Sequence, residues 1–504
     1  MNGFVTLVRL DAKLAARHKL VHVTAAIALV FGLLIAFVVP PPFDQRLIPS
    51  LFAVDLCVLG FMFGALMILQ DKEQATIGFY RVGPGTSLAY IAAKLTVNLG
   101  LSLLNLLILV GLGAPQALAE PALLTLVLGT CAGMTLLGMG LAVFFRSIAQ
   151  FFFPLAAVGL LGAMPMYLVL TPSAALAWTK WLPTYHVLFG AEAIMLGGDA
   201  AVIRSAILHC SIFAVLAAGF CGAAVHLRLM REGQSRSGTR SRRVAAPKRQ
   251  RSRSSTVPLG GSPKLARVLT MMRKDVLTGG RDQITLYMLL SPLLLGLLLA
   301  LLLPILEQAS EAAESSLRLV ATSLTVYCVT VIVGLMIGFA ILEEKITQIH
   351  VALDVSPLRF GEYLGAKLLL ATLLAAALSI PAVALPLGVD LDWLSVLAAV
   401  VASVPFAVSL GLLVGVLAKD QLGAVAVMKG LLPIWTSLPI LGFVLPDTWL
   451  WTQSPFANHW GVQGLFHALG DGVGVWTLAG LNLLTGLPVL IATAWMLRRR
   501  LGFS

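Results

Sequence analysis

Long apolar segments separated by short polar ones repeat along the whole chain. A helix needs about 20 apolar residues to cross the hydrocarbon core of a bilayer, and twelve segments approach that length. They lie near residues 20–40, 49–69, 88–113, 122–145, 150–171, 201–226, 286–306, 318–342, 361–386, 393–417, 424–446 and 474–496. The alternating pattern of a membrane barrel is absent, so the backbone must satisfy its hydrogen bonds within helices. The pattern predicts an all-α polytopic membrane protein with about twelve transmembrane helices.

Two kinds of shorter segment recur beside these runs. Apolar and charged residues interleave over residues 4–17 and 264–274, just before the first run of each half. Such amphipathic stretches suit helices that lie in the membrane interface. Residues 178–199 and 449–471 are semi-polar and rich in aromatic residues. Because Trp and Tyr favour the interface, we expect a re-entrant or interfacial helical hairpin there, on the outer side.

The chain contains an internal repeat. Windows 71–94 and 344–367 align without gaps and share six of their 24 residues. The shared pairs are Lys72/Lys345, Val82/Val355, Pro84/Pro357, Tyr90/Tyr363, Ala93/Ala366 and Lys94/Lys367. Arg9 and Asp11 also match Arg273 and Asp275. Six runs per copy is an even number, so the repeats are expected to be parallel. We therefore expect one six-span half over 1–230, a linker over 231–262 and a second six-span half over 263–504.

Composition agrees with a membrane protein. Hydrophobic residues make up 59% of the chain and charged residues 12%, whereas about a quarter of a soluble domain is charged; the mean hydropathy is +0.94. The net charge is +12, but nine basic residues and one acid between Arg231 and Arg253 contribute 9 − 1 = +8 of it. That linker has the composition of a disordered tether beside an anionic membrane surface, so we expect no nucleic-acid partner.

The distribution of Lys and Arg predicts the orientation. Both ends of the chain, the linker and the loops holding Lys72, Arg146, Lys345 and Lys419 are basic, and basic loops stay in the cytoplasm. The opposite loops are poor in basic residues. We expect a multi-pass protein of the bacterial inner membrane with both termini cytoplasmic.

Motifs for catalysis are missing. The chain has no GxxxxGK[ST] phosphate-binding loop, no HExxH and no GxSxG, so we expect neither ATP hydrolysis nor another enzymatic activity, and no cofactor or metal in this chain. The five cysteines all fall in apolar runs and are expected to be packing residues. A membrane-embedded enzyme or a scaffold without transport remains a third possibility.

The repeated polar loop has the form of a known element. Asp71-Lys72-Glu73 leads to Pro84, and Glu343-Glu344-Lys345 leads to Pro357; in both copies a Tyr and a Lys then open the third span. This arrangement resembles the type-2 ABC transporter permease family, with both permease halves fused in one chain. The second copy is similar to fluoroquinolone and other drug-export permeases. The resemblance covers nearly the whole chain.

The resemblance implies a function. The loop after the second span would be a coupling helix in a groove of a cytoplasmic ATPase. The chain would be the permease subunit of an exporter that works with two copies of a separate ATPase, which binds ATP and Mg. The substrate would be hydrophobic or amphipathic, such as a drug or antibiotic.

Ten residues are the candidates for ATPase coupling, because a coupling helix must present charges and stop abruptly at a proline. They are Asp71, Lys72, Glu73, Arg81, Pro84, Glu343, Glu344, Lys345, Asp354 and Pro357. The alternative is an ordinary solvated loop whose charges fix orientation. The first copy has Gly83-Pro84-Gly85 where the second has Ser356-Pro357-Leu358, so we expect two unequal ATPase contacts.

Candidates for the substrate path lie within the apolar runs. They are Asp55, Met62, Phe152, Met164, Met336 and Trp435. An ionisable group at membrane depth is a functional candidate, whereas the apolar residues could equally pack or face lipid. Lys94, Lys367 and Lys429 are expected to extend to the interface.

The main alternative is a twelve-span secondary transporter of the major facilitator type. That class also has six plus six spans and a long central loop. It would require a Gly- and Arg-rich loop after the second span, which residues 71–85 do not provide, and more intramembrane charge for ion coupling.

Overall fold

The computed structural model describes most of the chain. It covers residues 2–17, 20–37, 49, 57, 60–73, 76–77, 87–145, 151, 158, 179–230, 263–279, 283–307, 314–349, 359–420, 423–424, 427–428 and 453–501. Among these residues there are helices and turns and no strand, so the predicted all-α fold is confirmed over the described part of the chain.

The helices of the first half alternate long and short. They are α1 (Asn2–Arg17), α2 (Leu20–Phe37), α4 (Gly60–Glu73), α6 (Ser87–Gly113), the 3-10 helix η2 (Pro115–Ala119), α7 (Pro121–Ala142), α9 (Pro183–Leu196), α10 (Ala200–Ala224) and the π-helix η4 (Val225–Met230). Pro183 starts α9, where its missing N–H costs nothing, and Asp199 caps α10 by accepting from the Ala201 N–H.

The second half follows the same order. Its helices are α12 (Pro263–Gly279), α13 (Gln283–Glu307), α14 (Glu314–Ile346), α16 (Phe360–Leu387), α17 (Trp393–Leu417), α19 (Ala457–Leu469) and α20 (Val475–Leu501). Asp392 caps α17 by accepting from the backbone N–H groups of Leu394 and Ser395, which satisfies donors that the first turn leaves open.

Seven described helices are long and apolar enough to cross a membrane. They are Ser87–Gly113, Pro121–Ala142, Ala200–Arg228, Arg318–Ile346, Phe360–Leu387, Trp393–Leu417 and Val475–Leu501. Each coincides with a predicted span. Helices α2, α4 and α13 overlap three more predicted spans. The spans expected near 150–171 and 424–446 lie almost wholly outside the described residues and stay predictions.

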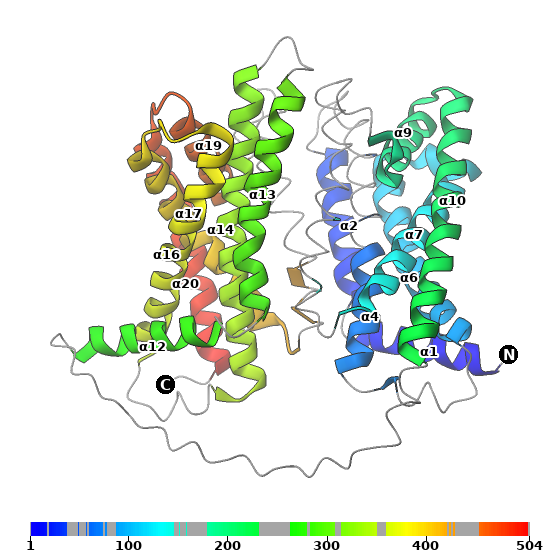
Figure 1. Cartoon of the computed structure of the whole chain (residues 1–504), viewed down its shortest axis with the longest axis horizontal. Helices are drawn as coiled ribbons and strands as arrows, with labels where there is room; N and C mark the ends of the chain where they lie inside the picture. The colour runs from blue at the N-terminus through cyan, green and yellow to red at the C-terminus, as the bar shows by residue number, and fades with distance from the viewer. Residues whose placement is uncertain are drawn as a thin grey trace.

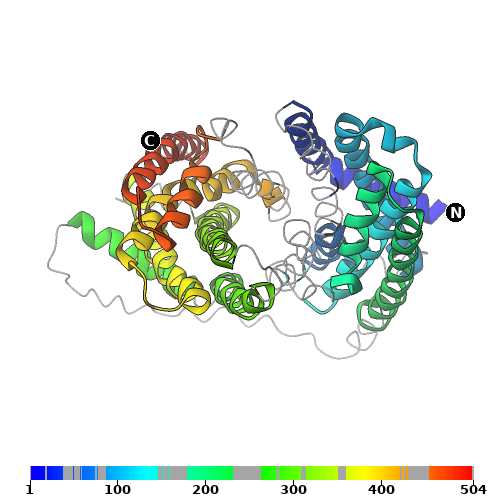
Figure 2. The same ribbon diagram turned by 90° about the horizontal axis from the view of Figure 1, so that it is seen from above.

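The two halves pack their helices in the same pairs. In the first half α1 and α2 contact α6, α4 contacts α7, and α10 contacts α7 and α9; in the second half α12 and α13 contact α16, α14 contacts α17, and α20 contacts α17 and α19. Each half has its own hydrophobic cluster, one from Ala15 to Val225 and one from Met271 to Leu501. Figures 1 and 2 show the two groups of helices side by side.

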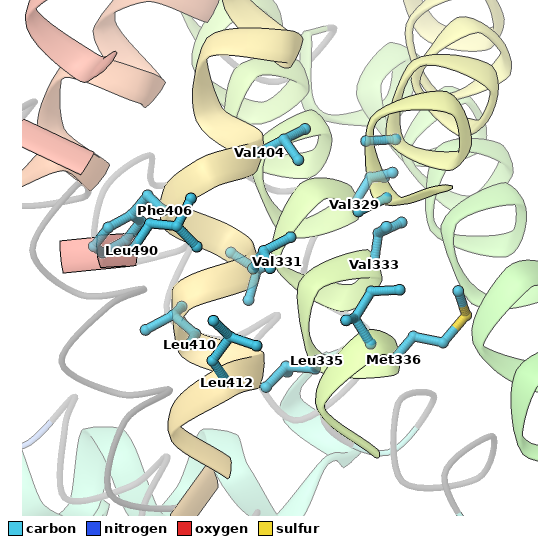
Figure 3. Packing of buried hydrophobic residues seen from close by; sticks show 14 of the residues in the cluster. Val329, Val331, Val333, Leu335, Met336, Val404, Phe406, Leu410, Leu412 and Leu490 are labelled. Carbon is cyan, nitrogen blue, oxygen red and sulfur yellow. The ribbon is translucent and has the colours of Figure 1, made fainter. Parts of the chain in front are cut away.

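Glycines allow the central helix pair of each half to approach closely. A Cβ on Gly64 of α4 would collide with the Thr135 carbonyl of α7, and one on Gly338 of α14 would collide with the backbone of Gly411 in α17. Small residues at a helix interface are the usual means of close packing in membranes. Around the second pair, Val331 and Leu335 of α14 pack near Leu410 and Leu412 of α17 (Figure 3).

The short helices lie at opposite ends of the long ones. Helices α1 and α12 run across one end, and α9 and α19 lie at the other (Figure 1). We call the first of these the α1/α12 end. Helices α9 and α19 fall within the two predicted outer hairpins, 178–199 and 449–471.

Candidate functional site: paired ion networks

A buried ion network joins three helices at the α1/α12 end of the first half. The Lys94 ammonium of α6 lies 2.8 Å from a carboxylate oxygen of Asp71 and 3.4 Å from one of Asp11. Asp71 also accepts hydrogen bonds from the Tyr90 hydroxyl at 2.7 Å and the Thr76 hydroxyl at 3.0 Å. We call Asp11, Asp71, Tyr90 and Lys94 the first network. It ties α1, the end of α4 and the start of α6 together.

The same network occurs in the second half. The Lys367 ammonium of α16 lies 2.9 Å from Asp275 of α12 and 3.1 Å from Glu344 of α14. The Tyr363 hydroxyl donates to Glu344 at 2.8 Å. We call Asp275, Glu344, Tyr363 and Lys367 the second network. Every member corresponds to a member of the first network in the repeat, so the two halves have kept the same construction.

The networks lie away from solvent. Lys94 and Lys367 are only 2% and 1% exposed. Burial raises the pKa of Asp11, against the opposing effect of Lys94, and burial likewise raises the pKa of Asp275 against that of Lys367. Each network sets two carboxyl groups against one ammonium, so burial and repulsion from the second carboxylate both raise the pKa of Asp11 and of Asp275.

The lysine next to each helix-end acid caps a neighbouring helix. Lys72 donates to the carbonyls of Ala142, Val143 and Phe145 at 2.7–2.9 Å, just where α7 ends. Lys345 donates to the carbonyls of Gly415 and Ala418 at 3.1 and 2.8 Å, at the end of α17. The last carbonyls of a helix lack partners and carry partial negative charge. Lys72 therefore attaches the end of α4 to the end of α7, and Lys345 attaches the end of α14 to the end of α17.

The second half has an additional ion pair between its amphipathic helix and its third span. Arg267 of α12 donates to Glu362 of α16 at 2.7 Å, and Glu362 also accepts from the Arg359 backbone N–H at the start of α16. The corresponding position of Glu362 in the first half is Ala89, 273 residues earlier. Helix α12 thus has two side-chain ion pairs to α16, whereas the described contacts of α1 with α6 include one.

The predicted coupling residues separate into two groups. Asp71, Lys72, Glu344 and Lys345 point into the helix bundle and make the contacts above, and Glu343 is exposed. Glu73 lies in the last turn of α4. Arg81, Pro84, Asp354 and Pro357 lie outside the described residues. An ATPase contact by any of these residues stays a prediction.

Of the predicted substrate-path residues, two are described. Met62 of α4 and Met336 of α14 belong to the hydrophobic clusters of their halves and are 8% and 7% exposed; Figure 3 shows Met336 on α14. Asp55, Phe152, Met164 and Trp435 lie outside the described residues. A role in the path stays a prediction for all six.

The expectation that Lys94 and Lys367 extend to the interface is wrong, because both are buried and paired with carboxylates. The sequence did contain the signal. Asp11 and Asp275 are a repeated pair in the sequence, but nothing in the pattern shows that they meet a lysine in the third span.

A small cavity lies beside the first network. Leu14 and Ala15 of α1, Phe63 and Met67 of α4, and the three charged members of the network line it. Within the described part of the chain, no group of three or more His, Cys, Asp or Glu is placed to hold a metal ion.

Comparisons with known proteins point to drug export. Residues 275–498 match the family model described as "Fluoroquinolones export permease protein Rv2686c-like". Two relatives from Mycobacterium tuberculosis are similar, the fluoroquinolones export permease proteins Rv2687c of strain H37Rv and MT2761 of strain CDC 1551. Each is 30% identical over 178 residues, which cover 34% of this chain and 69% of the relative. No solved structure matches the chain.

Proposed function

The chain belongs to the fluoroquinolone export permease family, and from this we propose that it is the membrane-spanning subunit of an ATP-driven ABC exporter. It carries hydrophobic or amphipathic drugs outward, with fluoroquinolones as the first substrates to test because the relatives are named for them. Two ATPase subunits, supplied by another chain, bind ATP and Mg. The permease itself contributes the pathway and the contacts through which the ATPases act.

The proposed architecture is twelve spans in two parallel six-span halves. The matching helix pairs of the two halves support it, as do the separate hydrophobic clusters. Basic residues gather in the linker and in the last turn of α20, which holds Arg498, Arg499 and Arg500, and this favours a cytoplasmic location for the α1/α12 end. The linker over 231–262 serves as a tether between the halves.

The observation that carries the proposal is the position of the two networks. Asp71-Lys72 and Glu344-Lys345 stand at the ends of α4 and α14, and the chain then enters the proposed coupling segments at 71–85 and 344–358. Each segment then leads into α6 or α16, which carry Tyr90 with Lys94 and Tyr363 with Lys367. A displacement of the segment by the ATPase would therefore act on three helices together: α1, α4 and α6 in the first half, or α12, α14 and α16 in the second.

A division of labour follows among the charged residues. The buried acids and lysines hold the segment in place, while exposed Glu343 and the residues over 78–86 and 350–358 meet the ATPase. The two meeting surfaces differ in sequence, with glycine on both sides of Pro84 and Ser and Leu beside Pro357. We therefore expect one ATPase contact to be stronger than the other.

Co-expression tests the proposal directly. The chain is expressed with the phosphate-binding-loop ATPase encoded beside it, purified, and placed in vesicles with a fluorescent fluoroquinolone. We expect co-purification, ATP hydrolysis stimulated by the drug, and drug movement that requires ATP. Transport by the chain alone, driven by a proton gradient, would establish the secondary-transporter alternative instead.

The contact surface has a test of its own. Replacing Glu343 by Ala removes charge from the second segment at an exposed position that is not a member of the second network. We expect weaker ATPase binding with unchanged thermal stability. Unchanged binding and unchanged drug-stimulated hydrolysis would show that this segment is an ordinary solvated loop.

A further inference from the structure

We propose that Asp11 and Asp275 are positioning residues that make the amphipathic helices α1 and α12 move with the coupling segments, by way of Lys94 and Lys367. This inference rests on the proposed function, because it concerns how movement at those segments spreads through the permease. Neither acid lies in a coupling segment, and neither was a candidate on sequence grounds.

The first argument is geometric. A single ammonium, that of Lys94, lies within 3.4 Å of acids from two different helices, α1 and α4, while its own backbone belongs to α6. Lys367 makes the same bridge among α12, α14 and α16. The coupling segment leaves from α4 or α14 and returns to α6 or α16. Each lysine therefore joins both ends of the segment to the helix that crosses the α1/α12 end.

The second argument concerns charge. Asp71 or Glu344 alone would neutralise the lysine, so the acid on α1 or α12 is not required to balance it. A further buried carboxylate carries a desolvation cost that its ion pair need not recover. The chain nevertheless places this extra acid in both halves, at corresponding positions. A role in linking the helices explains its presence where a gain in stability does not.

The third argument concerns rigidity. The acid at the helix end is held by a tyrosine hydroxyl as well as by the lysine, at 2.7 Å from Tyr90 in one half and 2.8 Å from Tyr363 in the other. Buried charge-assisted contacts of this kind have fixed directions. The amphipathic helices have polar and apolar residues suited to the membrane interface, so the networks connect the segments to elements at the membrane surface.

Asp11→Asn is the informative variant. It is close in size to the native residue and leaves Lys94 paired with Asp71, so the remaining pair is electrically balanced. In the permease with its ATPase, reconstituted in vesicles, we expect the amount of drug moved per ATP hydrolysed to fall about fivefold or more, the lower end of coupling between protein sites. Asp11→Glu restores the charge and should recover most of the ratio.

Lys13→Gln is the matched control. Lys13 lies in the same helix and is exposed, so its replacement should leave the ratio unchanged. In the second half, Asp275→Asn combined with Arg267→Gln removes both ion pairs of α12 to α16. This double variant should lower the amount of drug moved per ATP hydrolysed, as Asp11→Asn does. This second variant keeps the inference testable if Asp11→Asn proves unstable.

A distance measurement separates linkage from simple stability. Spin labels at Ala12→Cys in α1 and Leu88→Cys in α6, both exposed positions, should keep one narrow distance distribution through nucleotide binding. In the Asp11→Asn background the distribution should broaden when nucleotide binds.

The outcomes distinguish the two proposals. If the native chain recruits no ATPase and moves no drug with ATP, the proposed function fails. If the native complex couples transport to hydrolysis but Asp11→Asn and the α12 double variant keep the native ratio and the narrow distribution, the positioning role alone is overturned.

Discussion

The two halves share their ion networks but differ in how firmly each holds its amphipathic helix. In the first half α1 reaches Lys94 at 3.4 Å, and a cavity adjoins the contact. In the second half α12 reaches Lys367 at 2.9 Å, and Arg267 adds an ion pair to Glu362. The repeat has thus preserved which charges meet, while the strength of attachment has diverged. We infer that α1 is the more readily displaced of the two helices.

The largest expected effect comes from removing the bridging lysines. Lys94→Met or Lys367→Met leaves two buried carboxyl groups without their cation, and breaking a buried ion pair in this way costs about 3–5 kcal/mol. Such a loss is a large part of the stability of a typical domain. We expect both variants to give little monodisperse protein and a strongly lowered unfolding midpoint.

Exposed Lys13→Met serves as the control and should behave like the native chain. Normal stability for one lysine variant and collapse for the other would show that the two networks are not equivalent.

Much of the fold was predictable from the sequence because membrane helices have to be long and apolar. The run near 88–113 became α6, and the run near 393–417 became α17. The amphipathic pattern at 4–17 became α1, and the repeat around Tyr90 and Tyr363 led to corresponding structure. Hydropathy alone carries this information, since each helix satisfies its own backbone in lipid.

The networks were not predictable by the same reasoning. A lysine near the end of an apolar run looks the same whether it extends to the interface or is buried against acids from other helices. The choice for Lys94 depends on contacts with Asp11, which is 83 residues away, and periodicity contains no information about such distant pairs. The doubled occurrence of Asp, Tyr and Lys was the available clue.

The glycine contacts test whether the central helix pairs are as alike as the networks. Gly64→Val and Gly338→Val each place a side chain against the backbone of the partner helix. Overpacking of this kind costs about 1–3 kcal/mol, so we expect similar falls in the unfolding midpoint for both halves. Gly100→Val in α6 and Gly365→Val in α16 are matched controls, because open space surrounds both positions.

A fall limited to one half would contradict the equivalence of the α4–α7 and α14–α17 pairs. A fall in the control variants as large as in the test variants would trace the effect to valine in a helix and not to close packing.

Hydrogen–deuterium exchange sharpens the comparison between α1 and α12. In the native chain, amides of α1 should exchange faster than those of α12. Arg267→Gln alone should change the exchange rate of α12 little, because a partly exposed ion pair contributes little to stability and Asp275 still pairs with Lys367. Asp275→Asn added to Arg267→Gln removes both ion pairs of α12 to α16 and should raise the exchange rate of α12 above that of α1, which keeps its pair with Lys94. Equal rates in the native chain would remove the proposed difference in attachment.

The smallest effect on the unfolding midpoint is expected from the turns that follow α4 and α14, because these two turns differ in backbone conformation. In the first half Thr76 turns back onto Asp71, with its backbone N–H donating to the Asp71 carbonyl at 3.0 Å. In the second half the turn that follows α14 contains a non-glycine residue in the left-handed region, Gln348, with φ 58°. A left-handed conformation costs an ordinary residue about 1 kcal/mol through its Cβ, and glycine is the residue that most often occupies such a position after a helix.

Gln348→Gly should therefore raise the unfolding midpoint slightly, while Thr347→Gly should lower it, because Thr347 donates its hydroxyl to the Glu343 carbonyl at 2.7 Å. The expected gain depends on α14 keeping this closing turn when the permease is free of its ATPase. If Gln348→Gly instead lowers the midpoint, the turn is not strained in the free protein. Strain at Gln348 would then not distinguish the end of α14 from the end of α4.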